Sequence, residues 1–181
     1  MSEHLSLLVP SITGKPLVLE LRSVYEIEAR IHEVAGLTRG KAPELMSTFN
    51  KTYGKLHDLV FDLNLEKILA ERKLSEIKSV VILDQVPQIL KERGLANNRS
   101  PLGSEDLREA ILAQNSDYQN TLVIVKQIEC AIELLNGKMR SIQMAYQSVK
   151  KVYEDNSFLN KDINEPIEER HNSGFSDKVR Y

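Results

Sequence analysis

"IVKQIECAIELLNGKMRSIQMAYQSVKKVY", residues 124–153, contains one glycine and no proline. Its apolar side chains recur at steps of three and four residues, which is the spacing of one face of an α-helix. This face, the predicted seam, consists of Val125, Ile128, Ile132, Leu135, Met139, Ile142, Tyr146 and Val149. Further apolar residues widen it on one side: Ile124, Ala131, Ala145 and Val152. A lone helix buries none of these side chains, so we predict a helix from about Asp117 to Tyr153 that packs against at least two neighbours.

A second long helix is predicted from Pro43 to about Gln85. Its apolar positions alternate steps of four and three with one break at Lys67, a seven-residue repeat typical of coiled-coil-like packing. Pro87 is expected to end or kink this helix, because proline lacks the N–H that a helix interior requires. The repeat is formed by Phe49, Tyr53, Leu56, Val60, Leu63, Ala70, Leu74, Ile77 and Val81.

The remaining elements are shorter. Residues 1–15 are interpreted as a loosely held arm. Helical spacing from Leu17 to Val34 predicts a helix that begins at Pro16 and stops at Gly36. "GLANNRSPLGS", residues 94–104, has the composition of a loop. Ser104 has the position of an N-cap for a short helix over "EDLREAILAQ", and a second cap is expected at residues 115–117.

Together these elements predict an all-α fold: an elongated antiparallel hairpin of two long helices with a shorter N-terminal helix packed along it. Such a thin bundle has a large flank, which favours a homo-oligomer. Residues 1–153 form one elongated domain in this interpretation. Residues 154–181 are polar, acidic and aperiodic, and are predicted to be a disordered tail. Its "FLNKDI" segment is either a docking segment or a fraying helix end.

Composition and motifs argue against several classes of protein. Apolar runs are only a few residues long, which excludes a transmembrane helix, and the first residues lack the pattern of a secretory signal, so a cytoplasmic location is expected. Each of the four Gly-Lys pairs lacks the Ser or Thr of a phosphate-binding loop. A di-metal site in a helical bundle needs a Glu-x-x-His pair on each of two helices, and the sequence has one such pair, Glu168 and His171. Thr38 lies between two glycines, Gly36 and Gly40, but in a turn between two predicted helices rather than in the strand–turn–helix context of a nucleophile elbow. The single cysteine, Cys130, is expected to be buried. We therefore expect no enzyme, no metal and no cofactor.

Basic residues at the C-terminal end of the last long helix are the remaining candidate site. Between Gly137 and Val152 the chain carries no acidic residue and four basic ones: Lys138, Arg140, Lys150 and Lys151. A basic strip with an aromatic residue such as Tyr146 is typical of proteins that follow a phosphate backbone and stack a base. The alternative is a solvated face with Tyr146 in the core. The net charge of −2 does not decide between them.

Residues 40–153 resemble the UvsY-type recombination mediators of tailed phages. The resemblance is carried by "APELMSTFNKTYGKLHDLVFDLNLEKILAERKLSEIK" (42–78), "SDYQN" (116–120) and "ELLNGKMRSIQMAYQSVKK" (133–151). It implies a helical oligomer that binds single-stranded DNA and helps to load a recombinase against a single-strand-binding protein. It also implies DNA contacts by Lys138, Arg140, Lys150 and Lys151. The extra N-terminal helix, the acidic tail and the absence of an overall basic charge depart from that family.

Two hypotheses for function follow. The first is a non-enzymatic accessory protein that binds single-stranded DNA as an oligomer and assists recombinase loading. The second is a helical scaffold, adaptor or assembly chaperone that binds a protein partner and no nucleic acid. The basic strip favours the first hypothesis, and the acidic tail favours the second.

Overall fold

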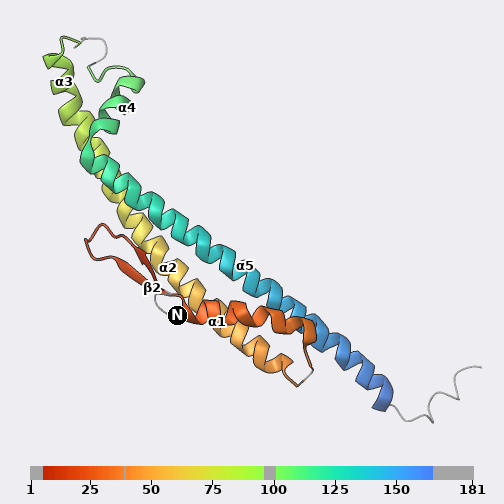
Figure 1. The fold of residues 1–181 in the computed structure, drawn as a ribbon. Coiled ribbons are helices and arrows are strands. Elements are labelled where there is room, and N and C mark those ends of the chain that lie inside the picture. Colours follow the sequence, from red (N-terminus) through yellow and green to blue (C-terminus); the bar gives the residue numbers. More distant parts are fainter. Residues whose placement is uncertain (1–5, 39, 96–100, 165–181) are drawn as a thin grey trace, which may run out of the picture.

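The computed structural model describes residues 6–38, 40–95 and 101–164. Two long helices lie side by side and form a rod, with a β-hairpin and a short helix against one flank (Figure 1). The mainly α-helical class, the long helix pair and the shorter N-terminal helix agree with the sequence-based prediction. In chain order the elements are β1 (Ser6–Val9), β2 (Leu17–Glu20), α1 (Arg22–Arg30), the 3₁₀ helix η1 (Ile31–Gly36), α2 (Ala42–Val80), the π-helical turn η2 (Val81–Gln85), α3 (Val86–Glu92), α4 (Glu105–Gln114) and α5 (Ser116–Asn164).

The helix pair α2 and α5 is antiparallel. Lys67 of α2 reaches Glu129 of α5 at 3.0 Å, whereas Phe49 of α2 shares a pocket with Ile142 of α5. Moving toward the start of α2 therefore means moving toward the end of α5. Between the helices, fully buried side chains recur every seven residues, which is the repeat expected of helices that pack along their whole length. They are Phe49, Leu56, Leu63 and Ala70 from α2, and Ile128, Leu135, Ile142 and Val149 from α5.

The N-terminal region differs from the prediction. Residues 6–9 and 17–20 form an antiparallel β-hairpin, where a loose arm and the first turn of a helix were expected. The turn between the strands includes Gly14, whose φ of +81° suits glycine. Val9 and Leu19 are buried, while the paired Leu8 and Val18 are exposed. This alternation is that of a strand with one face on the core.

The short N-terminal helix α1 begins at Arg22 rather than Pro16, and η1 ends at Gly36, where the helix was expected to stop. Val24 and Ile27 of α1 join the core formed by α2 and α5. The predicted wide stripe on α5 is thus covered from two sides, because α2 covers the seam and the N-terminal elements cover the flank beside it. Ala131 and Ala145, on that flank, are buried accordingly.

The helix passes Pro87 instead of ending before it. The N–H of Val86 bonds to the carbonyl of Val81, five residues back, so the turn before Pro87 is one residue wider than an α-turn. A widened turn accommodates the proline ring and its missing N–H between α2 and α3. α3 ends at Glu92, and Gly94, two residues later, has a φ of +67°. The N–H of Leu95 bonds to the carbonyl of Leu90 at 2.9 Å, as in a Schellman motif.

A second, smaller core closes the far end of the rod. It contains Val81, Val86 and Leu90 from one side and Ile111 and Leu112 of α4 from the other. The predicted N-cap is present, since Ser104 Oγ accepts a hydrogen bond from the N–H of Leu107 at 3.4 Å. Gly103, with a φ of +67°, lies against this core: an added Cβ would stand 3.1 Å from a methyl group of Leu107 and 3.3 Å from one of Leu90.

α5 begins after Asn115, whose Oδ1 accepts a hydrogen bond from the N–H of Tyr118 at 2.9 Å. The helix continues to Asn164, eleven residues beyond the predicted end at Tyr153. The start of the predicted disordered tail, including the "FLNKDI" segment, is therefore helical. Residues 165–181, the rest of that predicted tail, lie outside the described residues.

Candidate nucleic-acid interface

The eight residues of the predicted seam lie on the face of α5 that meets α2 and the N-terminal elements. Six of them are buried, and Ile132 and Tyr146 are half-buried against the same core. The chain itself therefore covers most of this face.

Lys138, one of the four candidate DNA contacts, is engaged inside the protein. Its ammonium group donates a hydrogen bond to Glu28 of α1 at 2.7 Å, and the side chains of the two residues are only 20% and 24% exposed. The same ammonium group lies 4.6 Å from the centre of the Tyr25 ring, a cation–π arrangement. Lys138 thus connects α5 with α1, and the DNA contact predicted for it stays a prediction.

The other three candidates remain at the surface. Arg140 and Lys151 are exposed, and among the described residues neither takes part in an ion pair. Lys150 lies 3.7 Å from Glu154, one helical turn away, with both side chains about half exposed. Such exposed pairs contribute little and are easily exchanged for another anion. Lys151 projects away from the seam, since it lies two residues from both Val149 and Tyr153.

Arg140 and Lys150 belong to one stripe of α5. Arg140, Gln143, Gln147 and Lys150 follow one another at steps of three, four and three residues, which places them along one side of the helix. Lys138, Ser141 and Ala145 form the stripe on the other side of the seam, where α1 and η1 pack. The stripe with Arg140 and Lys150 is therefore the flank of the rod that the N-terminal elements leave uncovered. We call it the open flank.

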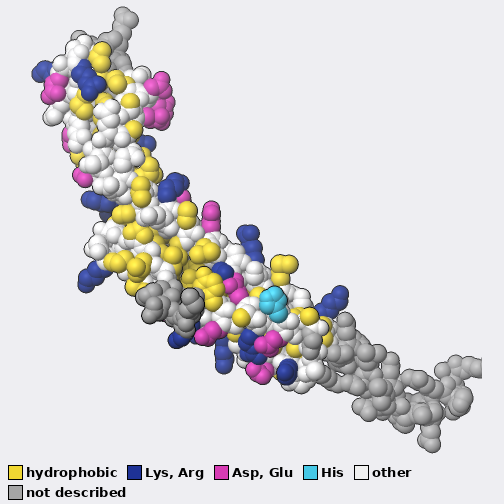
Figure 2. All heavy atoms as spheres, in the orientation of Figure 1, with side chains coloured by type: hydrophobic (Ala, Val, Ile, Leu, Met, Phe, Trp, Pro, Cys, Tyr) yellow, Lys and Arg dark blue, Asp and Glu magenta, His cyan; other side chains and the backbone are white. Residues whose placement is uncertain are grey.

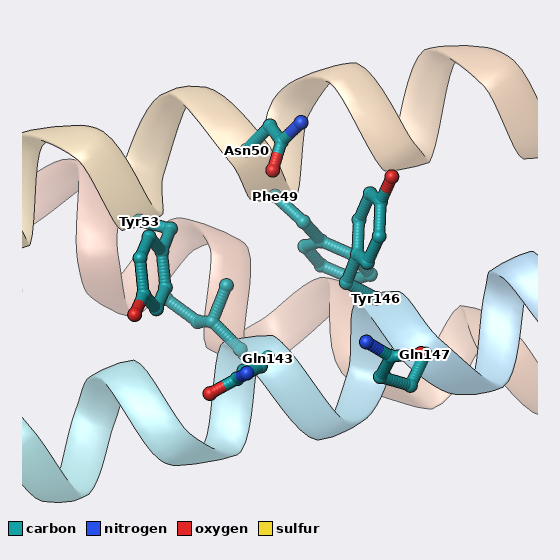
Figure 3. A pocket seen from close by; sticks show the side chains of 7 residues that line it. Phe49, Asn50, Tyr53, Gln143, Tyr146 and Gln147 are labelled. Carbon is teal, nitrogen blue, oxygen red and sulfur yellow. The ribbon is translucent and has the colours of Figure 1, made fainter.

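A pocket lies on the open flank between α2 and α5, and its volume is about 210 Å³. The rings of Tyr53 and Tyr146 stand on either side of it with Phe49 between them (Figure 3). The side-chain amides of Asn50, Gln143 and Gln147 lie at its rim. The pocket thus offers half-buried aromatic rings surrounded by neutral hydrogen-bonding groups. Arg140 and Lys150 lie one turn before Gln143 and one turn after Gln147, so the pocket has a cation on each side along α5.

Further along the open flank the charges are paired. Lys126 donates a hydrogen bond to the Glu129 carboxylate at 2.8 Å. Lys67 of α2 forms an ion pair with the same carboxylate at 3.0 Å. These contacts hold the pKa of the Glu129 carboxyl below its usual value, the hydrogen bond from Lys126 contributing most. The hydrogen bond to Glu129 likewise raises the pKa of Lys67. Lys67, which interrupts the apolar repeat of α2, therefore joins the two helices through an ion pair.

The hairpin side of the rod has a different character. On the face drawn in Figure 2, hydrophobic side chains gather where the β-hairpin meets the helix pair, and basic and acidic side chains are interspersed along the rod. Interspersed charges of both signs are typical of a solvated surface.

Other candidate chemistry finds no support in the described part of the chain. Cys130 is exposed, contrary to the prediction, because it lies two residues from both Ile128 and Ile132 and so projects away from the seam. Across residues 6–38, 40–95 and 101–164, no group of three His, Cys, Asp or Glu side chains is placed to hold a metal ion. Within the same ranges, none of the helices has the length and apolarity needed to cross a membrane.

Comparison of the chain with protein-family models, with curated proteins and with solved structures gives no match.

Two features of the surface were missed by reading the sequence. Tyr53 was predicted as a member of the apolar repeat of the second long helix; it is half-buried and forms a wall of the pocket on the open flank. Phe61, Leu65, Ile68 and Leu69 of α2 are all exposed, although each is large and apolar. They lie at positions of α2 between those of the buried repeat, and apolar residues at such positions are the signal that reveals a second apolar face.

Proposed function

We propose that the protein is a non-enzymatic accessory protein that binds single-stranded DNA as an oligomer and assists the loading of a recombinase. The observation that carries the DNA-binding part is the open flank: an aromatic pocket between two cations, in a stretch of α5 without acidic residues. Single-stranded nucleic acid is bound without sequence preference by this combination of a basic track and rings on which bases stack.

The chemistry of the open flank fits a single strand better than a duplex. An unpaired base has a free face for the rings of Tyr53 and Tyr146, while its edge can bond to the amides of Asn50, Gln143 and Gln147. Arg140 and Lys150 are separated by ten residues, which is about 15 Å along the helix. That spacing suits two phosphates of one strand on either side of the pocket.

Assistance to a recombinase rests on the resemblance of residues 40–153 to UvsY-type mediators. This resemblance implies two partners, a recombinase and a single-strand-binding protein. Their binding is to be tested after DNA binding itself.

The direct test is a fluorescence-anisotropy titration of a labelled oligothymidine with the full chain at low salt. The decisive variant is Arg140→Gln with Lys150→Gln, which removes both cations beside the pocket. A matched control is Lys91→Gln with Arg93→Gln, because it also removes one lysine and one arginine but at the far end of the rod, on and just beyond α3. We expect the first variant to weaken binding by more than about tenfold and the control to bind like the parent.

The pocket is tested separately with Tyr146→Leu, which keeps an apolar side chain in the seam but removes the ring. Loss of one stacked base is expected to cost about 1–3 kcal/mol of binding free energy. Absence of binding by the parent chain at low salt would refute the proposal, and so would equal loss of affinity in the control variant.

The second candidate function, a scaffold or adaptor for a protein partner, is favoured by one observation. Phe61, Leu65, Ile68 and Leu69 form an exposed apolar face on α2, and such contiguous faces commonly mark protein–protein contacts. The two functions differ in the anisotropy titration, since the adaptor binds no oligonucleotide at any salt concentration.

A further inference from the structure

An exposed apolar stripe runs along α2 on the side turned away from α5. It consists of Phe61, Leu65, Ile68 and Leu69, whose side chains are between 47% and 60% exposed. At 3.6 residues per turn the four positions span about 100° of the helix surface, which is one face. Leu56, Leu63 and Ala70, which are fully buried, occupy the opposite face. No element of the described chain covers the stripe.

We propose that a second copy of this chain covers the stripe, with the two α2 helices packed antiparallel about a two-fold axis at Leu65. Phe61, Leu65 and Leu69 are symmetric about this residue, whereas the position symmetric to Ile68 is held by Asp62. Phe61 lies four residues before Leu65 and Leu69 four residues after it, so in such a pair Phe61 meets Leu69 of the second copy and Leu65 meets its own equivalent. A self-complementary patch of this kind is what a two-fold contact requires.

The charges beside the stripe favour the antiparallel orientation. Asp58 lies seven residues before Leu65 and Arg72 seven residues after it, on the same side of the helix. The two-fold axis therefore brings Asp58 of one copy to Arg72 of the other, at both ends of the contact. Lys55 and Glu76, about ten residues from the centre on either side, are matched in the same way. A parallel pair in register would instead place like charges together, which is unfavourable.

The ion pairs within one protomer do not compete strongly with this contact. Arg72 Nε lies 3.4 Å from Glu76 Oε1, and the two side chains are 79% and 53% exposed. A pair this exposed has a small net free energy, so its guanidinium group remains available to a carboxylate of another chain. The apolar stripe supplies the affinity in this arrangement, and the flanking charges fix the orientation.

The dimer also has a consequence for DNA binding, and this step rests on the proposed function. A two-fold axis between antiparallel helices stands perpendicular to the plane that contains them, so the open flanks of both copies point to the same side. Tyr53 lies twelve residues before Leu65, about 18 Å along the helix, which separates the two pockets by about 36 Å. One strand can then run across both pockets.

The test is sedimentation velocity of the full chain without nucleic acid over a range of concentrations, so its outcome is independent of DNA binding. The parent is expected to be a dimer. Leu65→Asp places two like charges in the centre of the contact and is expected to raise the dissociation constant by more than about a hundredfold. The control is Met144→Asp, which also puts an acid at an exposed apolar position, 72% exposed, but on α5. Circular dichroism of each variant establishes that it is folded.

Charge reversal tests the orientation. Arg72→Asp alone is expected to weaken the dimer by about tenfold because it faces Asp58 of the second copy, and Arg72→Asp combined with Asp58→Arg is expected to restore the parent affinity. A monomeric parent at every concentration overturns the proposal, whether or not another protein binds the stripe. An oligomer unaffected by Leu65→Asp, or one that the double reversal does not restore, overturns it as well.

Discussion

Leu134 and Leu135 are neighbours on α5, and the packing of the helix pair predicts very different consequences when each is shortened. Leu135 is fully buried in the seam, whereas Leu134 is 43% exposed. Leu135→Ala removes three carbon atoms from a closed core. At about 0.8 kcal/mol for each buried methylene-sized group, the transfer contribution is about 2.4 kcal/mol. The cavity left behind adds to this, and we expect a loss of about 3–4 kcal/mol, within the range observed for buried leucines.

Leu134→Ala is the matched control, because it makes the same chemical change one residue away on the same helix. The gain in helix propensity from leucine to alanine is common to both variants and cancels in the comparison. With nearly half of its side chain already in water, Leu134 should contribute only about 1 kcal/mol. Urea unfolding followed by far-ultraviolet circular dichroism, at one protein concentration, measures both. Equal losses, or a larger loss for Leu134→Ala, would show that the seam is placed on the wrong face.

Three other predictions concern single contacts. Lys138→Met should lower the free energy of unfolding by about 1–3 kcal/mol, because Glu28 loses its charged partner in a half-buried site. The control Lys151→Met, on the same helix, should change the free energy of unfolding by less than about 0.5 kcal/mol. Denaturant unfolding measures both variants. Gly103→Ala should destabilise the far end of the rod, seen as a lowered thermal midpoint, since its positive φ and the nearby methyl groups both resist a Cβ. The lowered pKa of Glu129 stabilises the fold at pH values above the ordinary carboxyl pKa, and this contribution is lost as the pH falls through the lowered pKa. In Glu129→Gln, the free energy of unfolding should therefore decrease less on acidification than in the parent. Unfolding curves measured over a series of pH values test this.

The sequence predicts the long helices well because their burial is periodic. The seven-residue repeat through Phe49, Leu56 and Leu63, together with that through Ile128 and Leu135, requires an extended partner, and each helix supplies it for the other. Capping chemistry likewise predicts the bounds of α4. Ser104 caps its start, and Asn115, which caps the start of α5, follows its last residue. Local and tertiary preferences agree in these elements.

The β-hairpin was missed because its spacing is ambiguous. Leu17 and Leu21 fit a helical step of four, but Leu17, Leu19 and Leu21 also alternate as in a strand. The alternation in residues 7–9 and the glycine at position 14 between the two runs are the signals of a hairpin, and only the pairing of both runs makes them decisive.

The roles of individual charges depend on which neighbours the fold brings together. Lys138 and Arg140 are two residues apart and look equivalent in sequence. Because they lie on opposite flanks of the seam, Lys138 meets Glu28 of α1 while Arg140 remains in solvent. The position of α1, more than 100 residues away in sequence, decides between the two, and helical spacing alone contains no information about it. For the same reason the sequence left open whether the seam packs within one chain or between copies, and the structure shows the chain's own elements against it.

The salt dependence of DNA binding is the measurement that tests the central claim most directly. The dissociation constant of the parent chain for a labelled oligothymidine is determined at several salt concentrations, beside Arg140→Gln with Lys150→Gln and the control Lys91→Gln with Arg93→Gln. If Arg140 and Lys150 each bind a phosphate, the slope of log Kd against log salt should fall by about 1.4 in the first variant, at roughly 0.7 for each phosphate that is no longer neutralised, and stay at the parent value in the control. A slope that is the same in all three proteins, or no binding at the lowest salt, would contradict a nucleic-acid interface on the open flank.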